Sequence, residues 1–371
     1  MIVADKLLES IDSTSLAVST DSLDISFGEI ASMYDGGELE IRPTYQRLFR
    51  WSLTQQSQFM EFLLLGLPIP AIFVVETESR KYELIDGLQR ISSYLHFIGI
   101  LKNNDKYADN DKLRLRDCEI VSELNGLTIE DISPVLRIKI KRSYVKMYVI
   151  KKESSARIKY DMFKRLNTGG SLLEAQEIRS STMRFLNPTF IDFIQQLSQN
   201  KHFKNTITYI QESRIEQQYD DELVLRFFTL KNGNLSKYEQ GNSDYTLADY
   251  LTKFAEDISD KIIPFDYEKE AKIFEKTVEI LDETLGKEVF ANASKDFYAF
   301  YFEAFSIAVA ELGAISVEKT PSLKAKILAL KQDTDFQEYT QNEKHKRTSG
   351  SNYLEYLFKR LDLAKKYFSN L

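Results

Sequence analysis

The sequence holds few of the residues that build metal clusters and disulfides. Its 371 residues include one cysteine, Cys118, and three histidines that are far apart along the chain. A single cysteine excludes an internal disulfide and a cluster of cysteine ligands. Because Cys118 lies between Asp117 and Glu119 and lacks basic neighbours, we expect a thiol that packs in the core and not a reactive thiolate.

Long apolar runs and phosphate-loop motifs are also absent. No run of eighteen or more uncharged apolar residues occurs, and the N-terminal stretch MIVADKLLESIDS does not follow the charged and then apolar order of a secretion signal. We therefore expect neither membrane insertion nor export, and a cytoplasmic protein. No GxxxxGK[ST] sequence occurs either, which excludes the chemistry of that phosphate-binding loop.

Basic charge is scarce in total but concentrated in one stretch. The net charge is −7, whereas residues 137–165 hold eleven basic residues and only two acidic ones. Leu136, Ile138 and Ile140 alternate with basic residues, which predicts a strand with a cationic outer face. That face either contacts the phosphates of DNA or is a solvated strand whose lysines discourage edge pairing. The candidate DNA contacts are Arg137, Lys139, Lys141 and Arg142.

The length and the pattern of the elements predict two domains. Residues 1–186 alternate short strands and helices, with a helix over 26–34, a helix stopped by Gly66 and Pro68, strands in AIFVVE and KYELI, and a helix over 154–166. From residue 187 to residue 371 the sequence reads as helices of ten to twenty residues. We therefore predict an α+β domain over 1–186 and an all-helical domain over 187–371 that pack together.

The junction LIDGLQRIS places polar groups between a strand and a helix. Asp86 and Gly87 form the predicted turn, with Asp86 at the position of the helix N-cap. Arg90 then falls in the first helical turn, where a cation is unfavourable by some tenths of a kcal/mol unless an anion is near. Either Asp86 is that anion, or the strand, the glycine turn, the helix N-terminus and Arg90 form a corner that binds phosphate.

The stretch FKRLNTGGSLLEAQEIR predicts a second junction, between two helices. Gly169 and Gly170 can turn their N–H groups toward an anion, and Ser171 with Glu174 predicts a capping box. The same pattern is that of an ordinary helix connector, which the spacing alone favours. Arg165 can pair with Asp161 along its own helix.

A third cluster, IRPTYQRLFRW, interleaves arginines with aromatic residues. Such a segment grips phosphates and stacks on bases, or its arginines pack on its own aromatic rings by cation–π contacts. The arginines are Arg42, Arg47 and Arg50, and the aromatic residues are Tyr45, Phe49 and Trp51.

These stretches together resemble one known family. IRPTYQRLFRW, PIPAIFVVE, YELIDGLQRISSYLHFI and FKRLNTGGSLLEAQEIR occur in the order and approximate spacing of the N-terminal domain of GmrSD-type restriction proteins, also called domain of unknown function 262. The resemblance covers about residues 20–185 and implies a ParB/sulfiredoxin-like fold. The helical remainder is similar to the extension that commonly follows this domain.

The resemblance implies a cleft that binds a nucleoside triphosphate (NTP) and Mg²⁺. The first wall would be formed by Asp86, Gly87, Gln89 and Arg90, and the second by Arg42, Tyr45, Gln46 and Arg47. The rim would be formed by Arg165, Asn167, Gly169, Gly170, Glu177 and Arg179. Asp86 and Arg90 would be catalytic: arginine neutralises charge on a transferring phosphoryl group, and Asp86 or Glu177 could orient water or hold Mg²⁺. Leu88 stands where many members have glutamine, so a hydrogen bond from that position is missing.

The implied function is a regulatory or DNA-sensing component of a phage-defence or modified-DNA restriction system, which binds an NTP with or without hydrolysis. GmrSD-type nucleases often carry a His-Asn-His nuclease domain, but neither His96 nor His345 has a second histidine within reach along the chain. Cleavage would then come from a separate nuclease subunit, and we assign no metal-ligating residues. The alternative is a catalytically silent DNA-binding or protein-interaction module of the same fold. A redox enzyme is disfavoured because Cys118 lies outside every cleft motif.

Overall fold

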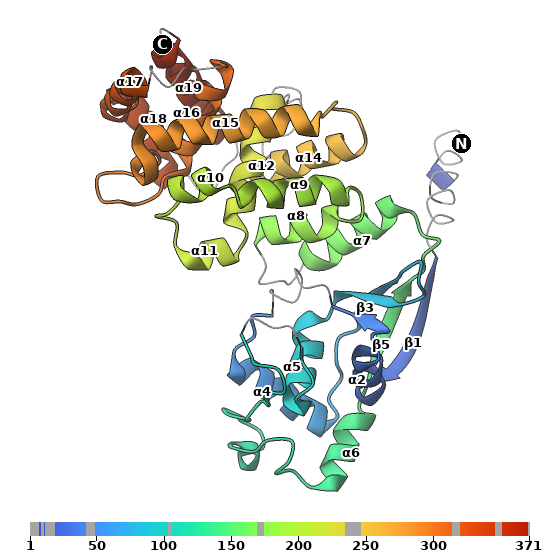
Figure 1. Cartoon of the computed structure of the whole chain (residues 1–371). Coiled ribbons are helices and arrows are strands. Elements are labelled where there is room, and N and C mark those ends of the chain that lie inside the picture. Colours follow the sequence, from blue (N-terminus) through green and yellow to red (C-terminus); the bar gives the residue numbers. More distant parts are fainter. Residues whose placement is uncertain are drawn as a thin grey trace. The chain divides into compact units, whose positions relative to one another are not determined.

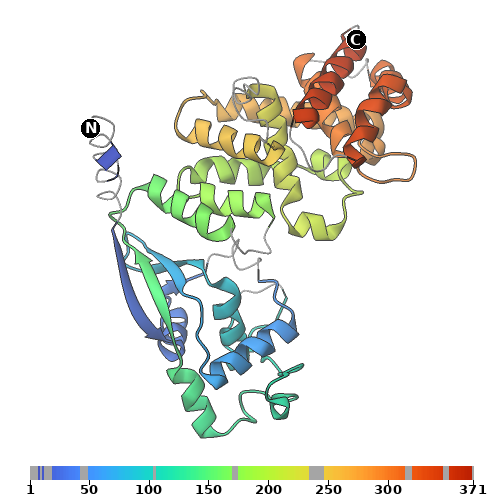
Figure 2. The ribbon, with the colours of Figure 1, turned by 180° about the vertical axis from the view of Figure 1, so that it is seen from behind.

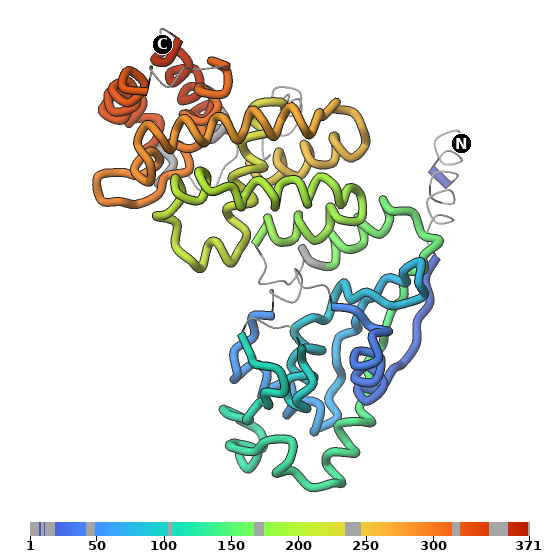
Figure 3. The backbone as a smooth tube through the Cα atoms, in the orientation of Figure 1, coloured from blue at the N-terminus to red at the C-terminus, as the bar shows by residue number. Residues whose placement is uncertain are grey.

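The computed structural model describes residues 19–41, 49–102, 106–168, 174–233, 246–313, 320–345 and 351–369, together with residues 7, 8 and 11. Contacts divide the chain into two compact units, Met1–Leu173 and Glu174–Leu371 (Figures 1 and 3). The first unit mixes strands and helices, and the second is helical. The domain boundary between residues 186 and 187 stays a prediction.

The first unit contains a five-stranded sheet. The strands are β1 (Thr20–Ser26), β2 (Leu39–Glu40), β3 (Ile72–Glu76), β4 (Tyr82–Asp86) and β5 (Tyr144–Ile150). The helices are α2 (Phe27–Asp35), α4 (Leu53–Leu65), α5 (Leu88–Ile98), α6 (Pro134–Arg142) and α7 (Ala156–Thr168), with a 3-10 turn at Ser122–Leu124.

The order of strands across the sheet is β1-β5-β3-β4-β2. β1 pairs with β5 and β3 pairs with β4 in antiparallel fashion, whereas β3 with β5 and β2 with β4 are parallel. Val145, Met147 and Val149 of β5 are buried, as expected for alternate residues on one face of a strand. The mixed architecture confirms the predicted α+β class.

Figure 2 shows the ribbon of the first unit from behind. Three of its helices meet through aromatic side chains. The ring of Phe27 in α2 lies 6.0 Å from that of Phe59 in α4 and 5.1 Å from that of Tyr94 in α5. Their edge-to-face geometry is favourable for aromatic pairs. As predicted, α4 ends at Gly66, which adopts a left-handed conformation with φ of 76°.

The strand predicted around residues 136–141 is wrong. Residues 134–142 form α6, and the strand begins only at Tyr144. Ser133 caps this helix by accepting a hydrogen bond from the N–H of Leu136, and Pro134 occupies its first turn, where proline is favourable. The helix buries Ile140 and exposes Ile138, so the alternation in sequence does not correspond to two faces of a strand.

The second unit consists of helices. They are α8 (Ala175–Met183), α9 (Pro188–Ser198), α10 (Lys201–Thr206), α11 (Glu212–Glu216), α12 (Tyr219–Asn232), α14 (Leu247–Ser259), α15 (Tyr267–Leu285), α16 (Ala299–Glu311), α17 (Thr320–Gln332), α18 (Thr334–His345) and α19 (Ser351–Phe368). A 3-10 turn at Gly286–Glu288 and an isolated bridge between Ala291 and Phe297 complete it. No helix in the described parts of either unit is long and apolar enough to cross a membrane.

A chain of five alternating charges runs through the second unit, with three of its side chains buried and two nearly so. Its members are Arg179, Glu222, Arg226, Glu303 and Arg360, from α8, α12, α16 and α19. Arg226 lies 2.6 Å from one Glu303 oxygen, and Arg360 lies 3.4 Å from the other. Burial raises the pKa of Glu222, but Arg226 and Arg179 outweigh it and hold that pKa below its usual value.

Asp221, also in α12, is buried, and its negative charge is only partly compensated by its neighbours. Burial and the neighbouring Asp220 raise the pKa of Asp221 to about 6, although hydrogen bonds from Ser198 and Gln195 oppose the shift. Because this pKa lies above that of an unfolded aspartate, the contribution of Asp221 to stability is present below about pH 4 and is lost as the pH rises through about 6.

We therefore expect Asp221→Asn to stabilise the protein at neutral pH. The gain in free energy of unfolding should be about 1–3 kcal/mol above pH 7 and should vanish near pH 4, since a shift of one pKa unit corresponds to about 1.4 kcal/mol. Urea denaturation of both proteins across this pH range measures it. Asp362→Asn on α19, where Asp362 is exposed, is the control and should show no such pH dependence. An equal gain at every pH would contradict the explanation.

Candidate functional site

Two parallel strands of the first unit, β2 and β4, run toward the same end of the sheet, and β2 pairs with the first two residues of β4. Leu39 and Glu40 of β2 are in register with Tyr82 and Glu83 of β4. β4 ends at Asp86, and α5 begins two residues later. In open α/β sheets, ligands bind outside the carboxyl ends of parallel strands. We call the end of β4, Gly87 and the first turn of α5 the β4–α5 corner.

Gly87 makes this corner possible. Its φ is +103°, and a Cβ atom placed there would lie 2.5 Å from Cγ2 of the buried Ile72 in β3. Any other residue would combine an unfavourable backbone conformation with a collision in the core. The sequence-based prediction of a glycine turn is thus confirmed, but the N-cap position is taken by Gly87 and not by Asp86, so the predicted cap was wrong by one residue.

Arg90 stabilises the β4–α5 corner through side-chain hydrogen bonds. Its Nη2 donates to Asp86 Oδ2 at 2.9 Å, and its Nη1 donates to the carbonyl of Ala71 at 3.0 Å and to that of Pro70. Asp86 is therefore the anion near the positive end of α5, which was one of the two alternatives for this junction. The Asp86–Arg90 ion pair does not cap α5, because no side chain accepts a hydrogen bond from the first turn of that helix. The N–H groups of this turn therefore provide a positive potential at the corner.

Gln89 connects the corner to the arginine-rich segment. Its Oε1 accepts hydrogen bonds from the N–H groups of Arg50 at 2.9 Å and Trp51 at 3.0 Å. The structure therefore brings the end of IRPTYQRLFRW against the start of α5. Arg42, Tyr45, Gln46 and Arg47 lie outside the described residues.

A buried polar network holds Trp51 from the other side. Gln56 donates from Nε2 to the Trp51 carbonyl and to the Tyr107 hydroxyl, both at 2.9 Å, and its Oε1 lies 2.8 Å from Nδ1 of His96. The His96 ring stacks on Tyr107 with centroids 4.0 Å apart. Burial lowers the pKa of His96, although Asp111 opposes the shift. Sequence reasoning missed this support, because its members are up to 56 positions apart and share no motif.

Leu88 and Cys118 of the first unit have packing roles. Leu88 is buried, so the residue that replaces a family glutamine belongs to the core. Cys118 is also buried, and burial, Glu61 and Asp117 raise its pKa to about 11. It is the packing cysteine that was predicted.

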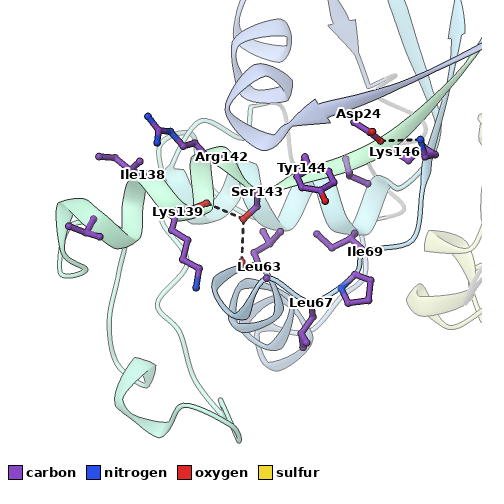
Figure 4. Close-up of a pocket in the computed structure, with 14 residues that line it drawn as sticks. Asp24, Leu63, Leu67, Ile69, Ile138, Lys139, Arg142, Ser143, Tyr144 and Lys146 are labelled. Carbon is purple, nitrogen blue, oxygen red and sulfur yellow. Dashed lines mark hydrogen bonds and ion pairs between the residues drawn. The ribbon is translucent and has the colours of Figure 1, made fainter.

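The predicted DNA contacts divide into two pairs. Arg137 donates to the carbonyls of Ile132 and Glu130, and the stem of Lys141 lies over Gly28 of α2. These two side chains support the fold. Lys139 and Arg142 line a groove beside α6 (Figure 4). Their charges lie along one stripe of a helix and not along a strand.

The predicted rim is only partly described. Arg165 is exposed in the last turn of α7, and Arg157 rather than Arg165 pairs with Asp161, at 3.5 Å. Asn167 belongs to α7, but its side chain lies outside the described residues, as do Gly169, Gly170 and Ser171.

The capping box predicted from Ser171 and Glu174 is displaced. Glu174 is itself the N-cap of α8, and its N–H donates to Oε2 of Glu177 at 2.8 Å. Glu177 is thus the third residue of the helix and closes the box. The pattern was read three residues too early, because Glu174 and Glu177 have the same spacing as Ser171 and Glu174.

Arg179 lies inside the second unit. Its guanidinium donates to Thr252 Oγ1 at 3.1 Å, to the Ala248 carbonyl at 3.2 Å and to Gln176, and it is the first member of the buried charge chain. These contacts stabilise the buried guanidinium within the second unit without a ligand. Its place on the rim of a cleft stays a prediction.

A metal site is not evident from side chains alone. In the described ranges, no three histidine, cysteine, aspartate or glutamate side chains gather closely enough to hold a metal ion. At the β4–α5 corner, Asp86 is the carboxylate that an incoming cation could contact, and it is half-buried beside Arg90. Any Mg²⁺ there would therefore depend on oxygens of the nucleotide and of water.

Comparison with known proteins gives one match. Residues 28–184 match the family model of the GmrSD restriction endonuclease N-terminal domain. The matched range runs from α2 to α8 and includes the β4–α5 corner. No curated protein and no solved structure matches the chain.

Proposed function

We propose that the chain is the nucleotide-binding regulatory or DNA-sensing part of a restriction system. Residues 28–184 match the family model of the GmrSD restriction endonuclease N-terminal domain, which suggests a component of such a system. In this proposal the first unit has the ParB/sulfiredoxin-like fold. Its β4–α5 corner binds the phosphates of an NTP with Mg²⁺. A separate nuclease subunit cleaves the DNA.

The observation that carries the proposal is the contact of Gln89, in the first turn of α5, with the end of the arginine-rich segment. The chain leaves β2 toward the segment with Arg42, Tyr45, Gln46 and Arg47, and Gln89 holds the returning segment against α5. A phosphate at the uncapped N-terminus of α5 would then lie beside the described end of that segment, Arg50 and Trp51. This arrangement supports nucleotide binding with the residues that the sequence motifs indicate.

Roles within the corner follow from the contacts. Gly87 lets the backbone turn close to the ligand, and Arg90 positions the turn while its guanidinium neutralises phosphate charge. Asp86, which pairs with Arg90 at 2.9 Å, would orient a water at the reacting phosphate or hold Mg²⁺, which would supply positive charge there. Hydrolysis would need the Asp86–Arg90 pair to open or to share the ligand.

We test the proposal by measuring phosphate release from each of the four NTPs with Mg²⁺, and the shift of melting temperature that each NTP causes. Loss of one charged donor at a reacting phosphate typically costs about 10²-fold in rate. We expect a loss of that size in Arg90→Ala and no nucleotide-dependent shift. Arg80→Ala is the matched control, because Arg80 also pairs with an acid four residues earlier, Glu76, at 2.8 Å on the surface.

Arg90→Ala also loses the hydrogen bonds by which Arg90 stabilises the corner. Removing Arg90 leaves Asp86 and two carbonyls without their donor, which should lower stability by about 1–3 kcal/mol. The assay is therefore run at a temperature at which circular dichroism shows both variants folded. A folded Arg90→Ala protein with unchanged release and unchanged melting shifts would exclude the corner as the nucleotide site.

A second candidate is a catalytically silent module that binds DNA or another protein. It is favoured by the commitment of Arg90 to Asp86 and two carbonyls, which gives the guanidinium a complete structural role. DNA held by phosphate contacts should dissociate steeply as salt rises, whereas a nucleotide pocket should select among bases or phosphate numbers. Salt-sensitive DNA binding without any NTP effect would favour this second candidate.

A further inference from the structure

A groove of the first unit has no part in the nucleotide corner. It lies between the end of α4, the loop that follows, α6 and the start of β5, and its volume is about 790 Å³ (Figure 4). Apolar side chains make up most of its wall, including Leu67, Pro68, Ile69, Val135, Ile138 and Tyr144.

One wall is a stripe of α6. Val135, Ile138, Lys139 and Arg142 follow the i, i+3, i+4, i+7 spacing of one helix face, and all four line the groove. The side chain of Ile140 is buried away from solvent. A surface helix normally turns polar residues outward, yet Val135 is 73% exposed and Ile138 is 50% exposed.

The opposite side adds an exposed aromatic residue. Tyr144, at the start of β5, is 68% exposed, and Leu67 after α4 is also exposed. Ser143 fixes this wall, since its hydroxyl donates to the carbonyls of Leu63 at 3.2 Å and Lys139 at 3.1 Å. Contiguous exposed apolar residues around a rigid groove are typical of a surface that binds a partner.

The charged residues of the groove indicate the sign of the charge that its partner carries. Lys139 and Arg142 have no acidic partner among the residues that the structure describes, while Lys146 is paired with Asp24 at 3.1 Å. The chain as a whole carries a net charge of −7. A local cationic rim beside apolar side chains therefore complements a segment that is apolar and acidic.

We infer that this groove docks an amphipathic segment of a partner protein, whose apolar residues are flanked by aspartate or glutamate. A nucleic acid fits less well, because the walls are mainly apolar and one of the three cations is neutralised by Asp24. A second copy fits less well too, because a two-fold contact would place Lys139 and Arg142 against themselves. Tyr144 and Arg142 are residue types that often dominate binding energy.

The test selects a displayed library of random peptides on the full chain, with counter-selection on the Ile138→Asp/Arg142→Glu double variant. We expect enriched peptides with apolar residues at helical spacing and several acidic residues. A labelled synthetic peptide of the consensus sequence should then bind the unchanged protein and lose at least about tenfold in affinity to the double variant, the loss typical of a buried interface residue. Ile262→Asp, at a residue that is 56% exposed in the second unit, is the control and should bind normally.

Three results would overturn the inference. The first is no enrichment, or enrichment of basic peptides. The second is that duplex or single-stranded DNA binds this face and loses affinity in the same double variant. The third is a dimer in sedimentation that the double variant converts to a monomer. The inference does not rest on the proposed nucleotide site, since the melting shift caused by NTP should be unchanged in the double variant.

Discussion

Replacing Glu303 by glutamine should lower the free energy of unfolding by about 3–5 kcal/mol, the usual cost of removing one partner of a buried ion pair. Glu303 is buried in α16, and its two oxygens face Arg226 and Arg360. The variant would leave both guanidinium groups buried beside an amide that carries no charge. Arg360 is buried in α19, and its Nη2 lies 3.4 Å from Glu303 Oε2.

Urea denaturation followed by far-ultraviolet circular dichroism measures this effect, because the helices of the second unit dominate that signal. The control is Glu355→Gln, which breaks an exposed pair with Lys359 at 2.5 Å on α19. Such surface pairs contribute about 0–1 kcal/mol. A loss in Glu303→Gln no larger than in this control would show that the buried charge chain does not stabilise the bundle.

Gly87→Ala should be comparably damaging, for a different reason. A left-handed φ costs an alanine about 1–2 kcal/mol, and forcing a methyl group into a packed core costs about 1–3 kcal/mol more. The added Cβ would meet Ile72 Cγ2 at 2.5 Å, so α5 or β3 must shift. We expect a loss of about 2–5 kcal/mol in stability together with the loss of any melting shift caused by NTP.

The chain offers a control that separates the two costs. Gly37 has a φ of +72°, and a Cβ placed there would meet nothing within 4 Å, so Gly37→Ala should show the backbone cost alone. In an Ile72→Ala background, the 2.5 Å contact is removed, and the contact with Cβ of residue 72 at 3.1 Å remains. The cost of Gly87→Ala should then fall toward that of Gly37→Ala, as a double-mutant cycle would measure. Equal costs at both glycines in the unchanged background would contradict the collision.

Local signals were sufficient for much of the first unit. The glycine that ends α4, the strands β3 and β4, and the helix after Gly87 are determined by neighbours in sequence, and the structure contains all of them. α6 was missed because the alternation of Leu136, Ile138 and Ile140 was given more weight than Ser133 and Pro134. A cap followed by proline is a stronger indicator of a helix than three alternating apolar residues.

Contacts between distant residues could not be predicted in this way. Arg226 and Glu303 are 77 positions apart, and Glu303 and Arg360 are 57 apart, so no window of sequence joins them. The motif that contains Arg179 predicts a rim residue, which stays a prediction, but it does not indicate that the described partners of Arg179 include residues of α12 and α14. The placement of a charged side chain inside or outside a bundle depends on which helices meet, and local patterns do not determine that.

The pairing of β1 with β5 has a consequence for how the protein is made. Thr20 pairs with Ile150, about 130 positions later, and β1 pairs with no other strand. At a synthesis rate of about 5–20 residues per second, β1 waits roughly 6–26 s on the ribosome before its partner exists. Its exposed surface carries Asp21 and Asp24, which oppose aggregation between neighbouring nascent chains during that wait. The sheet cannot form around β1 until β5 has been synthesised. We therefore expect the rate of translation between β4 and β5 to affect the yield of folded protein.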